Sequence, residues 1–316
     1  MLEVRNLKMY YKTLRGYVKA VDDVSFGLEK GESMGLAGES GCGKTSVAST
    51  ILRLLPINAK VVDGTIVFEG ENLLEMSKEK FRKEVRWKKL SVIFQGAMNA
   101  LNPVRKIGDS ISEAILCHES VTKREALDRA KRLLDLVGIG AERIERYPHE
   151  LSGGMKQRTM IAMALACNPH LIIADEPTTA LDVIIQAQVL KVMKDLRKKL
   201  DLSMMLISHD LSIIAETCNK CAIMYAGKIV EYGDIASMFR KPLHPYTGKL
   251  ISAFPSILGE RKKLSFIPGF PPNLLNPPPG CRFHPRCPDA REDCTKKEPE
   301  MIQVGKEHHV LCHRVE

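Results

Sequence analysis

The segment that decides the fold is Gly38–Thr45, which reads GESGCGKT. It matches the pattern G-x-x-x-x-G-K-[S/T] of a phosphate-binding loop and has one additional glycine, Gly41. The apolar run Met34–Ala37 precedes the loop and predicts a buried strand, and residues 46–55 predict a helix that ends at Pro56. The segment therefore lies between a strand and a helix, which is the context that a phosphate-binding loop needs.

Each part of this segment has a chemical role in binding a nucleoside triphosphate. The glycines allow successive backbone N–H groups to point inward and hold an anion, and the following helix adds its positive N-terminal end. Lys44 is expected to reach the β- and γ-phosphates, and Thr45 is expected to ligate Mg²⁺. The predicted nucleotide-binding residues of this segment are Gly38, Ser40, Gly41, Cys42, Gly43, Lys44, Thr45 and Ser46.

Composition limits the class of protein. The 316 residues can hold one large domain or two, and 44% of them are hydrophobic, which is enough for a substantial core. No segment approaches the roughly 18–20 apolar residues of a membrane span, and the N-terminus lacks the apolar segment of a signal peptide. We therefore expect a cytoplasmic protein, for which docking on a membrane protein remains open.

The net charge is +9, and basic residues concentrate at 78–89 and 191–199. Acidic residues are interleaved with them, which favours solvated helix faces. A surface for nucleic acid or lipid headgroups is the minor alternative.

Strands and helices alternate along most of the chain. Residues 2–9 alternate in polarity and predict an edge strand, residues 71–89 are polar and predict helix, and residues 96–165 predict a mainly helical insertion. Further elements are expected at 171–174 (strand), 184–200 (helix), 203–207 (strand) and 211–218 (helix). This alternation around a phosphate-binding loop predicts an α/β fold with a mainly parallel sheet that helices cover on both faces.

Two acidic residues, Asp175 and Glu176, follow the apolar strand at 171–174. Asp175 can hold Mg²⁺ through water, and Glu176 is placed to orient or deprotonate the attacking water. The alternative is a buried strand that merely has acidic residues in its exit loop. The phosphate-binding loop upstream favours the catalytic interpretation.

A second anion-binding segment is predicted at Leu151–Met155, which reads LSGGM. Ser152, Gly153 and Gly154 stand at the expected N-terminus of a helix, where backbone N–H groups are exposed. One chain needs only one phosphate cradle for one nucleotide. The second cradle therefore suggests a nucleotide that is held between two subunits.

These motifs, in this order, resemble those of the ATP-binding cassette (ABC) family over residues 1–240. The resemblance implies that Gln95, which follows a strand, contacts the nucleotide and Mg²⁺, and that His209 contacts the γ-phosphate. It also implies that the loop at 179–182, which contains Asp182, contacts a second cassette. The catalytic residues implied are Glu176, His209, Lys44 and Gln95.

An aromatic side chain stacks on adenine in this family, and Tyr11 lies at the corresponding place. Tyr10 and Tyr17 are the alternatives, because the N-terminal turn varies in length.

Three further segments resemble the peptide/nickel importer subfamily: FQGAMNALNPV at 94–104, YPHELSGGMKQR at 147–158 and HPYT at 244–247. The subfamily has a C-terminal extension, here expected at 241–316, with a proline run before GCRFHPRCP at 280–288. The resemblance implies an ATPase that powers the uptake of di- or oligopeptides, with nickel or oligosaccharides as alternative cargo.

The resemblance also implies partners. These are a second ABC ATPase (a different chain, or a second copy of this one), two transmembrane permease subunits and an extracellular solute-binding protein, with this chain at the cytoplasmic face of the membrane. A soluble ABC ATPase that acts on nucleic acid is the alternative from another class. The single cassette and the lack of a long coiled-coil insertion or an aromatic–basic surface argue against nucleic acid as a partner.

Four of the nine cysteines, Cys281, Cys287, Cys294 and Cys312, lie near the C-terminus. In an irregular, proline-rich segment, four thiolates can bind a metal that replaces a hydrophobic core. The close Cys-x-x-Cys pair typical of zinc is absent, and the wide spacings favour a [4Fe–4S] cluster, which some members of the resembled subfamily carry. Zinc and unmetallated thiols remain alternatives. The expected role is structural, and redox sensing stays open.

Overall fold

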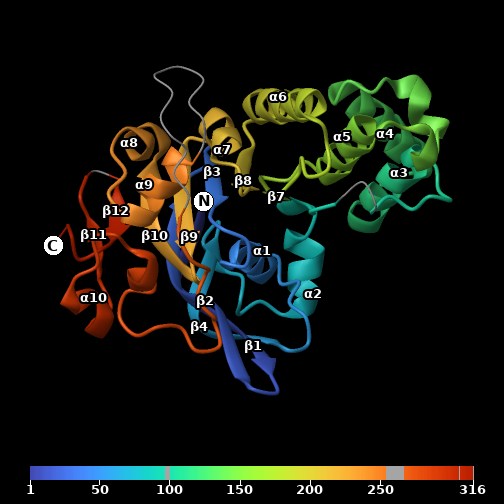
Figure 1. Ribbon diagram of the computed structural model, residues 1–316. Coiled ribbons are helices and arrows are strands. Elements are labelled where there is room, and N and C mark those ends of the chain that lie inside the picture. Colours follow the sequence, from blue (N-terminus) through green and yellow to red (C-terminus); the bar gives the residue numbers. More distant parts are fainter. Residues whose placement is uncertain (97–99, 254–266, 306, 316) are drawn as a thin grey trace. The chain divides into compact units, whose positions relative to one another are not determined.

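The structure is a computed structural model that describes residues 1–96, 100–253, 267–305 and 307–315 (Figure 1). The chain divides into two compact units, of which the first comprises residues 1–74 and 207–316 and the second comprises residues 75–206. The phosphate-binding loop belongs to the first unit, and the LSGGM and acidic segments belong to the second.

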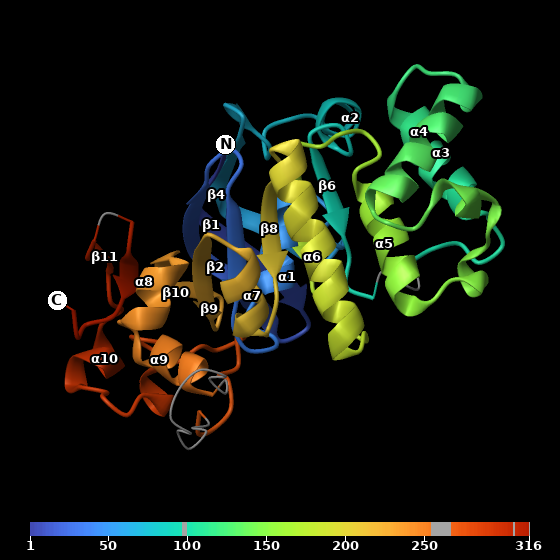
Figure 2. The ribbon, with the colours of Figure 1, turned by 90° about the horizontal axis from the view of Figure 1, so that it is seen from above.

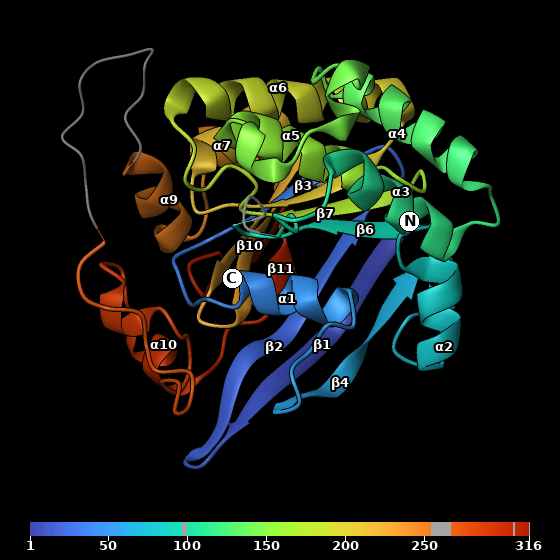
Figure 3. The ribbon, with the colours of Figure 1, turned by 90° about the vertical axis from the view of Figure 1, so that its right-hand side faces the viewer.

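An antiparallel sheet forms one layer of the first unit (Figure 3). β1 (Leu2–Thr13) pairs with β2 (Gly16–Leu28) on one side and with β4 (Ala59–Phe68) on the other, and β5 (Glu71–Asn72) completes the order β2-β1-β4-β5. β1 is thus an interior strand, and the expectation of an edge strand was wrong. Alternating polarity shows that one face of a strand is buried, but it does not show how many strands flank it.

The second sheet of this unit contains the strand that leads into the phosphate-binding loop. β3 (Ser33–Ala37) is parallel to β9 (Lys220–Tyr225), which pairs antiparallel with β10 (Lys228–Asp234). β12 (His309–Leu311) joins β10, and β11 (Met301–Gln303) joins β12. Every residue of β3 and β9 is buried, as expected for strands that are covered on both faces.

The helices of the first unit are short. They are α1 (Lys44–Ile51), α7 (Leu211–Thr217), α8 (Ile235–Arg240), α9 (Pro245–Ser252), α10 (Glu292–Lys296) and a 3₁₀ turn at His284–Arg286. α7 packs closely on β3, because a Cβ on Gly35 would lie 2.2 Å from Ile214 Cγ2. A larger residue at position 35 would therefore displace α7 from the strand that precedes the loop.

An aromatic cluster joins the C-terminal extension to β9. The ring centroids of Tyr225 and Tyr246 lie 4.7 Å apart, those of Tyr225 and Phe283 lie 5.1 Å apart, and those of Tyr246 and Phe283 lie 5.3 Å apart. All three side chains are fully buried. Such aromatic pairs contribute about 0.5–1.5 kcal/mol each beyond the burial of their area. The extension is thus packed into the first unit by a core of its own.

The second unit has a parallel sheet. β6 (Leu90–Ile93) pairs with β7 (Leu171–Asp175), and β8 (Ser203–Ile207) lies on the other side of β7. α6 (Val183–Leu200), the long helix in Figure 2, begins at Asp182, whose carboxylate accepts two backbone N–H groups of its first turn. The strands and the helix predicted at 171–207 are confirmed.

Further helices of the second unit group together in Figure 2: α3 (Ile107–His118), α4 (Lys123–Leu136) and α5 (Gly153–Ala164). Short 3₁₀ turns at Ala141–Glu145 and Pro148–Glu150 connect α4 to α5. Apolar residues of α3 and α4, such as Ile111, Ile115 and Leu134, recur at helical spacing and are buried. Part of the loop that precedes them, residues 97–99, lies outside the described residues.

The segment at 71–89 is only partly helical, which corrects the expectation. After β5, α2 (Lys78–Lys80) continues as a π-helical turn at Phe81–Val85. Lys83 Nζ lies 2.8 Å from Glu79 and Lys80 Nζ lies 4.0 Å from Glu84, so these two basic side chains pair with acidic ones on an exposed surface. Across the described residues, no helix is both long enough and apolar enough to cross a lipid bilayer.

His244 is buried at the start of α9. Its backbone N–H donates to Glu231 Oε2 at 3.0 Å, and its Nδ1 accepts the backbone N–H of Tyr246 at 3.1 Å. The residue is 1% exposed, and burial lowers the pKa of the His244 imidazole to about 3. The neutral form is therefore the one that the fold holds, since only an unprotonated Nδ1 can accept a hydrogen bond.

We expect acid to destabilise the first unit through His244. The unfolded imidazole binds a proton at its ordinary pKa of about 6.5, whereas the folded one binds it only near pH 3. The unfolded state thus binds more protons between these values, so stability falls as the pH drops, by up to about 1.4 kcal/mol per pH unit. His244→Asn keeps a side-chain acceptor and should flatten the profile of the free energy of unfolding in urea below about pH 6. Parallel profiles of the two proteins would contradict this assignment.

Candidate nucleotide-binding site

The phosphate-binding loop runs from the end of β3 to the start of α1, and its backbone geometry depends on glycine. Gly38, Gly41 and Gly43 have φ values of 147°, 79° and 110°. A Cβ on Gly38 would lie 2.2 Å from a carbonyl oxygen of β9, and a Cβ on Gly43 would lie 2.1 Å from the carbonyl oxygen of Ala20. Only glycine fits these two positions, and the loop is packed against β9 of one sheet at Gly38 and against β2 of the other sheet at Gly43.

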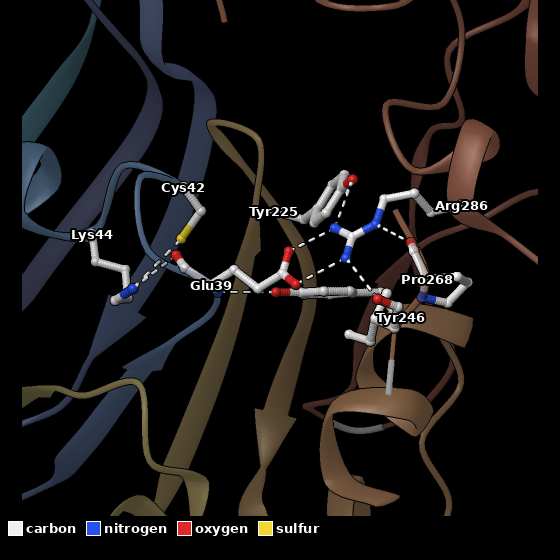
Figure 4. Close-up of polar contacts among 8 residues, drawn as sticks. Glu39, Cys42, Lys44, Tyr225, Tyr246, Pro268 and Arg286 are labelled. Carbon is white, nitrogen blue, oxygen red and sulfur yellow. Dashed lines mark hydrogen bonds and ion pairs between the residues drawn. The ribbon is translucent and has the colours of Figure 1, made fainter. Parts of the chain in front are cut away.

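Lys44 begins α1 and is folded back over the loop (Figure 4). Its Nζ donates to the carbonyl oxygens of Gly38 at 2.7 Å and Glu39 at 3.1 Å, and the side chain is buried. The ammonium group therefore lies within the curve of the loop, where an anion would be bound. Thr45, the predicted Mg²⁺ ligand, is exposed.

Cys42 is buried inside the same loop. Burial raises the pKa of its thiol, although Lys44 acts in the opposite direction. Its Sγ would lie 2.8 Å from a Cβ on Gly38, so the side chain fills the space under the loop. Cys42 is thus a packing residue that stays protonated at neutral pH.

The three candidate tyrosines occupy different environments. The hydroxyl groups of Tyr11 and Ser46 are 3.1 Å apart, which joins β1 to α1. Tyr10, the next residue along the strand, instead donates to Asp22 Oδ1 at 2.6 Å, and Tyr17 is 50% exposed on β2. Tyr11 is therefore the tyrosine whose side chain reaches the helix of the phosphate-binding loop.

His209 is exposed in the turn before α7. The neighbouring Asp210 begins this helix and accepts the backbone N–H of Ser212 at 2.8 Å. His209 directly precedes this helix start and belongs to the same unit as the phosphate-binding loop.

In the second unit, Gln95 and Glu176 are brought together from two neighbouring strands. Gln95 follows β6 and Glu176 follows β7, and Gln95 Nε2 donates to Glu176 Oε2 at 2.9 Å. Thr179 Oγ1 donates to the same oxygen at 3.1 Å. Asp175, the last residue of β7, is buried. Two donors on one carboxylate oxygen hold Glu176 in a defined orientation.

The backbone of Glu176 is in an uncommon conformation, with φ at 45°. Non-glycine residues seldom adopt this left-handed region, and such residues concentrate at functional sites. The sequence analysis assigned no role to Thr179 beside this carboxylate. The position of Thr179, three residues after Glu176, could have indicated this contact, because a four-residue turn brings its first and last residues close together.

The LSGGM segment forms the start of α5, as predicted. Ser152 is the N-cap residue, and its Oγ accepts the backbone N–H of Met155 at 3.4 Å. A Cβ on Gly154 would lie 2.5 Å from Ile185 Cγ2, so this glycine allows α5 to approach α6 closely. Gly153, between Ser152 and Gly154 in the sequence, is the first residue of α5. Asp182 is the N-cap residue of α6.

Two residues that the sequence analysis did not connect with the loop also contact it (Figure 4). The backbone N–H of Glu39 donates to Tyr246 Oη at 3.0 Å, and the carboxylate of Glu39 pairs with Arg286. Tyr246 belongs to HPYT, and Arg286 belongs to GCRFHPRCP. These motifs marked a family, but nothing in their spacing indicated a contact with a loop some 200 residues earlier in the chain.

The four C-terminal cysteines gather in one part of the first unit. The backbone N–H of Cys281 donates to the carbonyl oxygen of Cys294 at 2.8 Å, and His313, next to Cys312, bonds to the carbonyl oxygen of Lys297 at 2.9 Å. Burial, and to a smaller extent the three other thiols, raise the pKa of Cys281 to about 11. Among the residues that the structure describes, no group of three or more His, Cys, Asp or Glu side chains is arranged so that it could hold a metal ion.

Comparison with known proteins yields two family models. One, described as "ABC transporter", matches residues 21–179, and the other, described as "Oligopeptide/dipeptide transporter, C-terminal region", matches residues 230–294.

Curated relatives match almost the whole chain. A probable peptide ABC transporter ATP-binding protein of Sinorhizobium fredii is 45% identical over 99% of this chain and 95% of its own length. The oligopeptide transport ATP-binding protein AppD of Bacillus subtilis is 46% identical over 99% and 96%, and OppD of Escherichia coli is 42% identical over 95% and 89%.

Among solved structures, the ATP-binding cassette MJ0796, bound to ADP and Pi, superposes with a TM-score of 0.66 at 24% identity over 74% of this chain and 99% of that one. The structure of cbiO1 from Clostridium perfringens gives a TM-score of 0.66 at 24% identity, over 76% and 90%. At this identity the superpositions establish the fold.

We expect Gly43→Ala to destroy the phosphate-binding loop. The new Cβ would lie 2.1 Å from a carbonyl oxygen at a φ of 110°, which should cost about 3 kcal/mol of stability and abolish ATP binding in a calorimetric titration. Gly41→Ala is the matched control, because nothing lies within 4 Å of its Cβ and only the strain of its φ remains. The control should lose about 1–2 kcal/mol and keep measurable ATP binding. Equal effects of the two variants would show that close packing does not constrain the loop.

Proposed function

The chain belongs to the ABC transporter family and carries the C-terminal region of its oligopeptide and dipeptide transporters, and we propose that it is the ATP-hydrolysing subunit of a peptide importer. The observation that carries ATP binding is the ammonium of Lys44 inside a glycine loop at the start of α1. The cargo rests on relatives named for peptide and oligopeptide transport over almost their whole length. Nickel and oligosaccharides are the alternative cargo.

The first unit binds the triphosphate in this proposal. The backbone N–H groups from Gly38 to Ser46 surround the β- and γ-phosphates, which replace the carbonyl oxygens of Gly38 and Glu39 as partners of Lys44. Tyr11 stacks on adenine, since its side chain reaches α1. His209 contacts the γ-phosphate.

Mg²⁺ is the proposed metal ion, and when bound it would neutralise charge on the phosphate oxygens. Thr45, Asp175 and Gln95 are the proposed ligands. The hydroxyl, carboxylate and amide oxygens of these residues are the ligand types that Mg²⁺ prefers, which supports the assignment.

Glu176 is the proposed general base for the attacking water. Its carboxylate accepts hydrogen bonds from Gln95 and Thr179, which orient it at the carboxyl end of the parallel strands. A base held by two donors loses little entropy when the water aligns. The left-handed backbone at Glu176 further supports a functional position.

The proposed assembly contains a second ABC ATPase, either a different chain or a copy of this one. Ser152, Gly153 and Gly154 of one subunit would face the γ-phosphate held by the other. The exposed side chains of Val183 and Ile184, 81% and 72% accessible beside the Asp182 loop, support a contact surface there.

The further proposed partners are two transmembrane permease subunits and an extracellular solute-binding protein, which would place this chain peripherally at the cytoplasmic face of the membrane. We propose that Gln95 and the loop at 96–103 couple ATP hydrolysis to the permease, because they join the catalytic core to the helical insertion. Phe94 and Val104, which flank this segment, are 46% and 79% exposed. A nucleic-acid partner is the alternative from another class, and the exposed pair of Lys83 with Glu79 supports a solvated helix face in the basic segment instead.

We also propose that Cys281, Cys287, Cys294 and Cys312 hold a [4Fe–4S] cluster. Their common location and the Cys281–Cys294 backbone hydrogen bond support a shared site. The wide spacings of the four cysteines along the chain, without a close Cys-x-x-Cys pair, favour the cluster over zinc, which is the alternative metal. The cluster would brace the extension, and redox sensing is the alternative role.

Glu176→Gln should reduce ATP hydrolysis by about 10²–10⁴-fold, the usual contribution of a general base, and should leave ATP binding intact. The measurement is phosphate release together with retention of labelled ATP. Glu79→Gln, at an exposed carboxylate in the same unit, is the control and should behave as the wild type. Undiminished turnover of Glu176→Gln would remove this residue from the role of base.

The protein purified without oxygen should be brown and contain about four iron and four sulfide ions per chain. Cys287→Ser should lose the colour and the iron, whereas Cys117→Ser, at an exposed cysteine of α3, should keep both. A colourless protein with one zinc ion, or with no metal, would sink the cluster and leave the ATPase assignment untouched.

A further inference from the structure

Glu39, the second residue of the phosphate-binding loop, is held on three sides (Figure 4). Its backbone N–H donates to Tyr246 Oη at 3.0 Å, and its carbonyl oxygen accepts from Lys44 Nζ at 3.1 Å. Its carboxylate accepts from both terminal nitrogens of Arg286, at 2.6 and 2.9 Å. Two of these three partners belong to the C-terminal extension, so the extension fixes the first peptide units of the loop.

The Arg286 guanidinium is itself firmly placed. Its Nε donates to the carbonyl oxygen of Pro268 at 2.8 Å, and it lies over the ring of Tyr225 with its central carbon 5.7 Å from the ring centroid. Its side chain is only 5% exposed, and that of Glu39 is 26% exposed. Bidentate arginine–carboxylate pairs of this kind have a defined geometry, and shielding from water strengthens their electrostatic interaction.

The sign of the charges matters at this place. Glu39 puts a carboxylate on a loop whose task is to bind a polyanion, and an unpaired carboxylate there would repel the phosphates. Arg286 neutralises that carboxylate from outside the loop. The extension therefore supplies the positive charge that balances the Glu39 carboxylate.

We propose that the C-terminal extension acts on ATP binding, with Arg286 as a positioning residue that neutralises Glu39 and, together with Tyr246, holds the phosphate-binding loop. This inference rests on the proposed ATP binding and adds a second site to it. Because Arg286 directly precedes Cys287, the conformation of the cysteine region and the occupancy of the nucleotide site are coupled. Coupling of this kind is reciprocal. If the conformation of the cysteine region strengthens nucleotide binding by some factor, nucleotide binding favours that conformation by the same factor.

The first test compares three variants by their dissociation constants for a non-hydrolysable ATP analogue with Mg²⁺. Arg286→Gln, which leaves the Glu39 carboxylate unpaired, should weaken binding about tenfold. Glu39→Gln, which leaves the arginine charge in place, should bind as tightly as the wild type or more tightly. The double variant should return to within about threefold of the wild type, because both charges are gone.

A merely structural ion pair would behave differently. In that case Glu39→Gln would weaken binding as much as Arg286→Gln, and the double variant would not recover; that result, or normal binding by Arg286→Gln, would overturn the inference. Arg314→Gln is the control, since it removes an exposed arginine of the same extension that pairs with Asp289, and it should bind normally. If the wild type itself bound no nucleotide, the proposed function would fail instead, and the two failures are thus distinguishable.

The second test measures the reciprocal effect by amide hydrogen exchange in the full chain. The analogue should slow exchange in residues 267–287, and Arg286→Gln at saturating analogue should show a smaller effect. Identical exchange of these residues with and without bound analogue in the wild type would overturn the coupling, whatever metal the cysteines carry.

Discussion

The structure depends on the close contact of the phosphate-binding loop with one strand of each sheet of the first unit, β9 at Gly38 and β2 at Gly43. Gly38 and Gly43 bring the loop so near to carbonyl oxygens that a Cβ at either position would lie within 2.2 Å of one. This contact fixes the start of α1 and, with it, the place of Lys44. The buried strands β3 and β9 supply the rigid base, and Tyr225, at the end of β9, anchors the aromatic cluster of the extension. The loop, the helix and the extension thus share one support.

Much of the fold could be predicted from sequence because its signals are local. A few neighbouring residues suffice to recognise the loop motif, the helix start at Ser152 and the apolar strand before Asp175. Each of these elements is present in the structure. The role of β1 as an interior strand was not predictable in this way. Strand neighbours are chosen by pairing over long separations, as between β1 and β4, and alternation in one strand carries no information about them.

Sequence alone could not predict the contacts of the candidate site that join distant segments of the chain. Gln95 and Glu176 were each predicted, and their hydrogen bond follows from neighbouring parallel strands. The ion pair of Glu39 with Arg286 could not be predicted from neighbouring residues, because in sequence each of them looks like an ordinary exposed charge. The four cysteines were predicted to share a site from their clustering in sequence. Their spacing did not determine the positions of the sulfurs, because the irregular chain between them has no fixed rise per residue.

Whether this ATPase powers peptide import is tested most directly by its rate of ATP hydrolysis in vesicles. These vesicles contain the chain together with its permease subunits, partner ATPase and binding protein. The measurement compares added di- and oligopeptides with nickel and with oligosaccharides. The proposed function predicts that peptides raise the rate several-fold over the unstimulated complex and that the other solutes leave it unchanged. A complex that hydrolyses ATP, ignores peptides and responds to nickel or to a sugar would contradict the claim that this ATPase powers peptide import.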